Sequence, residues 1–336
     1  MAKTLTMPTY RIVLKEAFDI VKKRKFLWVF GFFAALLGAG GEFETLFTSY
    51  SNLAQTSTDI LSVQSLYQGG VIWSMFTNVK YFIGTYPWQT FIFILMFVVL
   101  GLVLLWLAII SQIALFDAAA KFKNNKKVGY AEGYRIGNKF FGPVFLINVV
   151  VKVILYFLFI AVSAPLITWF LVGNSVLGGV IFIILLFLLY IPLSIIAAFV
   201  VKYTVAYIVI KDKKWQEAIK LSWELFKKNW LTTIEMAFIL LVFGILVGLA
   251  IILLVGISSI PFILISLVAI FINSSLLFNA ATFIGIIVWF IIIAILGAAY
   301  VSYQYTAWTL LFLKLVDRKA ESKLVRWFSK IVPDKA

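Results

Sequence analysis

Residues 90–110 read TFIFILMFVVLGLVLLWLAII, a run of 21 residues without one charged side chain. A helix of roughly 20 apolar residues is long enough to cross a hydrocarbon layer about 30 Å thick. Runs of comparable length and character recur further along the chain, at 144–172, 176–201, 231–257 and 283–301. These five runs predict five membrane-spanning helices.

A sixth, shorter apolar stretch lies at 26–40. It follows a basic cluster and ends in the small residues of 38–41. Such a pattern is also typical of a cleavable signal peptide. The helical pattern of the 25 residues before it and its many Phe and Trp residues favour an anchor that is not cleaved. We therefore predict an all-α, polytopic transmembrane helix bundle with about six spans.

The composition agrees with a protein surrounded by lipid. Hydrophobic residues make up 63% of the chain and charged residues 13%, whereas soluble domains are about 45–50% apolar and about 25% charged. No stretch is polar enough to fold separately in water, so residues 1–336 are interpreted as a single membrane domain. The chain contains no Cys and no His, which excludes disulfides, thiolate nucleophiles and imidazole bases.

The basic residues are distributed unevenly, and their distribution predicts the orientation. Of 29 Lys and Arg residues, 26 fall within four segments: 1–25, 119–140, 211–229 and 314–336. The intervening polar stretches contain almost none. Loops rich in Lys and Arg stay on the cytoplasmic side of a membrane. We therefore predict a multi-pass protein of the cell (inner or plasma) membrane with both termini in the cytoplasm.

The apolar run at 262–272 is ambiguous. Counting it as a seventh span would place the basic C-terminal segment outside the cell. We expect the 262–279 region either to be re-entrant or interfacial, or to extend the fifth span outward.

The chain also shows an internal similarity. Residues 18–23, FDIVKK, match residues 223–228, WELFKK, and a weaker copy lies at 134–139. Each copy precedes an apolar hairpin. We predict three parallel hairpin repeats at 8–127, 128–213 and 214–319, followed by a cytoplasmic tail at 320–336, with pseudo-threefold packing.

The stretches before the odd-numbered spans have an apolar stripe at helical spacing and many lysines, which predicts amphipathic interfacial helices on the cytoplasmic side. The alternative is that they are only the ends of long spans. We expect their basic residues to contact anionic inner-leaflet lipids and not nucleic acid, because they flank membrane segments. The candidate contacts are Lys22, Lys23, Arg24, Lys25, Lys126, Lys127, Lys227 and Lys228.

Polar residues within apolar spans are costly and need an explanation. Lys152 and Asn148 lie one helical turn apart in the third span, and Glu235 lies near the start of the fifth. A Lys152–Glu235 ion pair would be a candidate proton or ion relay, whereas the competing interpretation is that both side chains reach the inner interface. We expect Lys202, which is close to a cytoplasmic end, to reach that interface too.

No phosphate-binding loop, dinucleotide fingerprint, nucleophile elbow or metal-ligand pattern occurs in the chain. We therefore predict no catalytic residue, no cofactor and no metal site.

The pattern of Glu16-Ala17-Phe18 before Trp28, and of Glu217-Ala218-Ile219 before Trp230, resembles a group of uncharacterised prokaryotic membrane proteins. These look like the membrane domain attached to some glycerophosphodiester phosphodiesterases. The sequence departs from those enzymes because no soluble phosphodiesterase domain, with its His and metal-binding carboxylates, follows the membrane part. The resemblance therefore implies a membrane domain, and the catalytic activity of those enzymes is not transferred to this chain.

Three functions remain open at this stage. The first is a non-enzymatic module that binds lipids or a membrane-protein partner. The second is a transporter or permease with a path between the repeats, and the third is an intramembrane enzyme that modifies lipids.

Overall fold

The computed structural model describes residues 9–35, 84–124, 126, 128–171 and 176–317, and within these ranges every regular element is an α-helix. This confirms the all-α prediction. The helices are α1 (Thr9–Lys23), α2 (Phe26–Ala35), α6 (Pro87–Lys123), α7 (Tyr130–Lys139), α8 (Phe141–Leu171), α9 (Val176–Lys211), α10 (Trp215–Lys228), α11 (Trp230–Phe271) and α12 (Ser275–Val316).

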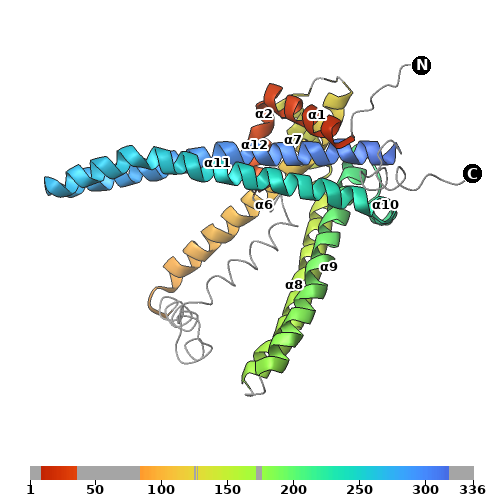
Figure 1. Ribbon diagram of the computed structural model, residues 1–336, viewed down its shortest axis with the longest axis horizontal. Helices are drawn as coiled ribbons and strands as arrows, with labels where there is room; N and C mark the ends of the chain where they lie inside the picture. The colour runs from red at the N-terminus through yellow and green to blue at the C-terminus, as the bar shows by residue number, and fades with distance from the viewer. Residues whose placement is uncertain (1–8, 36–83, 125, 127, 172–175, 318–336) are drawn as a thin grey trace, which may run out of the picture.

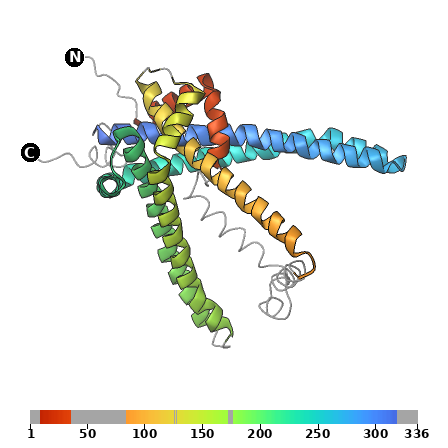
Figure 2. The same cartoon turned by 180° about the vertical axis from the view of Figure 1, so that it is seen from behind.

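The long helices form three arms that diverge from a common centre (Figures 1 and 2). One arm is α6, the second is the pair α8 and α9, and the third is the pair α11 and α12. Five helices in the described residues are long and apolar enough to cross a membrane, namely α6, α8, α9, α11 and α12. The chain is therefore a membrane protein by the length and composition of its helices.

The long helices exceed what a bilayer requires. Helices α11 and α12 have 42 residues each, which corresponds to about 63 Å at 1.5 Å per residue, or roughly twice the hydrocarbon thickness. Each arm has two zones along its length. The distal part of α12, up to Gly297, is mostly exposed and apolar, whereas from Ala298 onward most of its side chains are buried.

The buried zones meet in a structure that we call the hub. It is formed by the C-terminal parts of α6 from Ala108, α9 from Phe199 and α12 from Ala298, the first turns of α8 and α11, and the short helices. Trp308 of α12 is fully buried at its centre, with ring centroids 5.5 Å from Phe199 and 6.3 Å from Tyr203. Aromatic rings that pack at such distances add stability beyond the area they bury. The hub therefore holds the three arms together.

Each of the three short amphipathic helices, α1, α7 and α10, packs against a different long helix of the hub. Helix α7 lies against α6, α10 lies against α9, and α1 lies against α12. Each therefore contacts the last long helix of the preceding hairpin, with α1 closing the ring onto the final helix. Their apolar stripes are largely covered by protein: Ala17 of α1 and Ala218 of α10 are fully buried. The internal repeat itself stays a prediction.

Two glycines permit close helix contacts in the hub. A Cβ atom on Gly31 of α2 would lie 2.2 Å from the carbonyl oxygen of Ala298 in α12, and one on Gly137 of α7 would lie 2.8 Å from that of Ile110 in α6. Neither backbone oxygen can move away without breaking helix geometry. The packing therefore requires glycine at both positions.

The structure resolves the alternatives for 262–279. Helix α11 continues through Pro261 to Phe271, and α12 begins at Ser275. Residues 262–271 therefore extend the helix of the predicted fifth span, 275–279 begin the next helix, and the re-entrant alternative is wrong. Asn273 adopts a left-handed conformation with φ of 55°, and the Ser274 side chain caps α12 by accepting from the Leu277 amide. These residues make a tight turn between two long helices.

The first predicted span is described only as α2, which has 10 residues. A helix of that length reaches about 15 Å, so it does not by itself establish a sixth crossing. The rest of that predicted span, at 36–40, and the predicted cytoplasmic tail at 320–336 lie outside the described residues.

Candidate functional site

The predicted lipid-contacting residues lie at the ends of short helices on the hub. Lys22 and Lys23 form the last turn of α1, and Lys227 and Lys228 form the last turn of α10. Cations are favourable there because unpaired carbonyl groups give the helix C-terminus a partial negative charge. The described members of the set are all exposed: Lys22, Lys23, Arg24, Lys25, Lys126, Lys227 and Lys228. Lys127 lies outside the described residues.

Aromatic rings position two of these basic side chains. The Arg24 guanidinium lies 5.2 Å from the centroid of Phe122, and the Lys227 ammonium lies 5.2 Å from that of Trp223. Cations within about 6 Å of an aromatic face are attracted by the negative face of the ring. These contacts orient the side chains at the surface of the hub.

The three predicted intramembrane polar residues lie on two helices, Asn148 and Lys152 on α8 and Glu235 on α11. Asn148 of α8 donates through Nδ2 to Gln112 Oε1 of α6, over 3.1 Å, and to the Val144 carbonyl oxygen of its own helix. The Tyr10 hydroxyl of α1 donates a hydrogen bond to Glu235 Oε2 of α11. Lys152 is exposed on α8. The Lys152–Glu235 ion pair stays a prediction, since the partner shown for the Glu235 carboxylate is Tyr10.

The prediction for Lys202 is wrong. Its side chain does not reach an interface but is buried in the hub, with 7% of the residue exposed. The ammonium lies 4.8 Å from the centroid of the Trp308 ring. The sequence predicted that Lys202 lies near the end of its helix and close to water. In the structure, α9 continues inside the hub for nine more residues and ends at Lys211.

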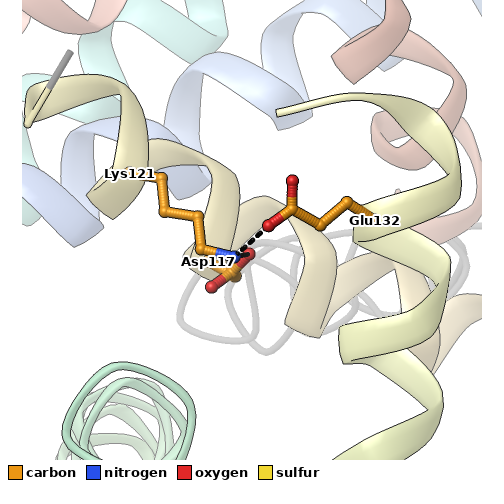
Figure 3. A network of polar contacts seen from close by, with 3 residues as sticks. All are labelled: Asp117, Lys121 and Glu132. Atoms are coloured by element: carbon orange, nitrogen blue, oxygen red, sulfur yellow. Dashed lines mark hydrogen bonds and ion pairs between the residues drawn. The ribbon is translucent and has the colours of Figure 1, made fainter. Parts of the chain in front are cut away.

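An ionic clamp joins α6 to α7 and was missed by the sequence reasoning (Figure 3). Lys121 lies between two carboxylates, 2.9 Å from Asp117 Oδ2 on its own helix and 2.7 Å from Glu132 Oε1 on α7. The hydrogen bond from Lys121 lowers the pKa of the Glu132 carboxyl, and the nearby Arg135 acts in the same direction. The i,i+4 spacing of Asp117 and Lys121 was a readable signal for one half of the clamp.

A groove runs between α1, α11 and α12, with a volume of about 510 Å³. Side chains of α1 form one wall, and Ile239, Phe243 and Tyr303 form the other. Both apolar and basic groups line it. The groove lies where the hub meets the exposed apolar part of α11.

No family model, curated protein or solved structure matches this chain. The resemblance to the membrane domain of some glycerophosphodiester phosphodiesterases therefore stays a hypothesis.

The described charged side chains form ion pairs and an exposed basic surface. Within the described ranges, no group of three or more Asp, Glu, His or Cys side chains is placed to hold a metal ion. The two carboxylates of the clamp share one lysine, which neutralises charge and links two helices. Exposed cations beside exposed apolar helices are suited to contact both parts of a phospholipid.

Proposed function

We propose that the protein is a non-enzymatic membrane module that binds anionic phospholipids around its hub. One observation carries the proposal: exposed cations lie at the ends of α1 and α10 and after α6, and those of α10 directly precede α11, whose apolar side chains Trp230, Ile234 and Phe238 are exposed. In this proposal the hub faces the cytoplasm and the apolar arms lie in the bilayer.

Electrostatics supports this arrangement. Each Lys or Arg near an anionic membrane surface contributes about 1 kcal/mol, and the attraction falls off within about 8–10 Å at physiological salt. The side chains must therefore lie close to the headgroups to act. Lys227 and Lys228, which directly precede the long apolar helix α11, satisfy that requirement when α11 is inserted.

The arms favour a lipid surface or a second membrane protein as neighbour. Large apolar side chains such as Phe97, Phe157 and Leu253 are exposed by 55%, 73% and 65%. Surfaces of that kind are covered by lipid tails or by other membrane helices. A membrane-protein partner is therefore compatible with the proposed lipid binding and would add to it.

The test is native mass spectrometry of the full-length chain extracted from a membrane that contains phosphatidylglycerol and phosphatidylcholine in equal amounts. We expect enrichment of phosphatidylglycerol on the wild type and reduced enrichment on the quadruple variant Lys22→Gln, Lys23→Gln, Lys227→Gln, Lys228→Gln. Equal retention of both lipids by the wild type would contradict the proposal.

A matched control replaces lysines that already face carboxylates. Lys139 lies 3.7 Å from Asp212, and Lys213 lies 2.6 Å from Glu217. The variant Lys139→Gln, Lys213→Gln should keep the enrichment of the wild type, since these charges are partly neutralised by their partners.

A transporter with a path between the hairpins is the second candidate. The observation that favours it is the hydrogen bond between Asn148 and Gln112, which places paired polar groups between α8 and α6. In this case Lys152→Ala should leave the protein folded and abolish flux in liposomes. Unchanged flux in a working assay would remove the relay from consideration.

A further inference from the structure

We propose that the groove between α1, α11 and α12 is a specific site for one anionic phospholipid, with the phosphate at Arg11 and Lys15 and an acyl chain along α11. This inference rests on the proposed function and deepens it, because it names one site where that function requires only a basic surface.

The wall on α1 carries both kinds of group that a phospholipid needs. Its side chains are Tyr10, Arg11, Leu14, Lys15 and Phe18. Arg11 and Lys15 are exposed and four residues apart, so their side chains leave the same face of α1, the one that borders the groove. An arginine and a lysine at that spacing suit a phosphodiester, which the guanidinium can hold through two parallel hydrogen bonds.

The opposite wall is apolar and partly uncovered. Phe243 of α11 is 41% exposed, and its ring centroid lies 5.4 Å from that of Tyr303 on α12, which is buried. Across from it, Phe18 of α1 is 53% exposed. Val13 and Ala17 are buried on the face of α1 that packs onto the hub. Phe18 lies outside that buried face, so its ring can contact another apolar group.

The groove is held open by a defined contact between its walls. Tyr10 is buried and donates its hydroxyl hydrogen to the Glu235 carboxylate, which joins α1 to α11 at one end of the groove. Glu235 lies one turn before Ile239, which is part of the apolar wall. This bond helps to set the position of α1 relative to α11, so a ligand finds the apolar groove already formed, with Arg11 and Lys15 beside it.

The combination of groups favours a lipid over a protein helix. A helix from a second protein would need a long apolar face, whereas this groove is a short apolar channel with two basic residues, Arg11 and Lys15, among those that line it. Its position at the junction of the hub and the exposed part of α11 is where the headgroup and the upper acyl chain of a phospholipid meet. Charge and polarity thus match a single anionic lipid.

The experiment compares two double variants with the same change in net charge. Arg11→Gln, Lys15→Gln removes the cations beside the groove, and Lys139→Gln, Lys213→Gln removes two lysines that lie outside the groove and face Asp212 and Glu217. Native mass spectrometry of each full-length protein, titrated with phosphatidylglycerol, measures the first bound lipid. We expect its affinity to fall by about tenfold or more in the groove variant, because two charged hydrogen-bond donors are lost, and to stay near the wild-type value in the control.

A second variant tests the apolar wall without changing charge. Ile239→Trp fills the groove and should also weaken the first binding event, while inorganic phosphate should not compete with the lipid. Circular dichroism and gel filtration establish that each variant is folded. This variant keeps the proposal testable if the Arg11 and Lys15 substitutions prevent folding.

The outcomes separate the two proposals. Equal loss of binding in the groove and control variants, or no loss in either, would overturn the specific site and leave the basic-surface function standing. No preference of the wild type for phosphatidylglycerol would overturn both. A stoichiometric protein that occupies the groove and excludes lipid would overturn the site as well.

Discussion

The hydroxyl groups of Tyr203 in α9 and Thr233 in α11 lie 2.8 Å apart inside the hub. Thr233 Oγ1 donates its one hydrogen to the Asn229 carbonyl oxygen of its own helix, so Tyr203 must be the donor between the two helices. Both side chains are buried. The second and third arms are therefore joined by a bond with a defined direction.

Tyr203→Phe tests this bond. The substitution removes only the donor, and Thr233 still has its bond to Asn229, so we expect a loss of about 1 kcal/mol in the free energy of unfolding. Thermal unfolding in detergent, followed by circular dichroism, measures the loss. The matched change Tyr86→Phe, at a residue that is 49% exposed, should have no measurable effect. Equal stability of the two variants would contradict the assigned role.

Gly137→Ala should loosen α7 from α6. Its Cβ atom would lie 2.5 Å from Ile110 Cγ2 and 2.8 Å from the Ile110 carbonyl oxygen, and overpacking of this kind costs about 1–3 kcal/mol. Gly142→Ala is the control, because a Cβ atom there would meet nothing within 4 Å. Hydrogen exchange of the α7 amides reports the change. Faster exchange in Gly142→Ala than in Gly137→Ala would show that the packing has been misjudged.

The clamp predicts a pH dependence in the acid range. The pKa of Glu132 is below its ordinary value of 4.5 because Lys121 donates a hydrogen bond to the ionised form. The stabilisation is therefore complete above the ordinary pKa and is lost as the pH falls through the lowered one. The effect is small, since the Glu132 side chain is one third exposed.

Glu132→Gln isolates this contribution from that of other carboxylates. Wild type should be more stable than the variant at neutral pH, and the difference should shrink toward zero in acid. Thermal unfolding of both proteins across the range from about pH 7 to about pH 3 measures it. A difference that does not change with pH would mean that the carboxylate charge of Glu132 contributes nothing.

The orientation can be tested because the chain has no cysteine. Single cysteines introduced as Lys126→Cys and Lys228→Cys should react with a membrane-impermeant maleimide only from the cytoplasmic side. Tyr86→Cys, before the start of α6, should react only from the outside. Labelling of Lys126→Cys from outside intact cells would disprove the proposed topology.

The pattern of apolar runs was sufficient to predict the long helices, because each run must satisfy its own backbone in lipid and only a helix does so within one segment. The same principle explains why α11 continues through Pro261: a break there would expose backbone groups next to apolar surface. Pro261, which precedes the apolar run at 262–272, therefore does not end the helix.

The site could be predicted only in part. The basic residues at the ends of α1 and α10 were identifiable because they are local clusters beside apolar runs. The Tyr10–Glu235 hydrogen bond joins residues 225 positions apart, and no local pattern indicates such a contact. Lys202 was misplaced for the same reason, since its burial depends on Trp308 of another helix.

Hydropathy alone determined that this chain is helical and spans a membrane, because transfer of apolar segments into lipid depends on composition and length. Only the tertiary structure decided that the ends of α6, α9 and α12 meet in a hub, that Gly31 and Gly137 carry close contacts, and that α1 and α11 enclose a groove. These features depend on which surfaces meet in space, and side-chain shape and hydrogen bonding between distant residues determine that choice.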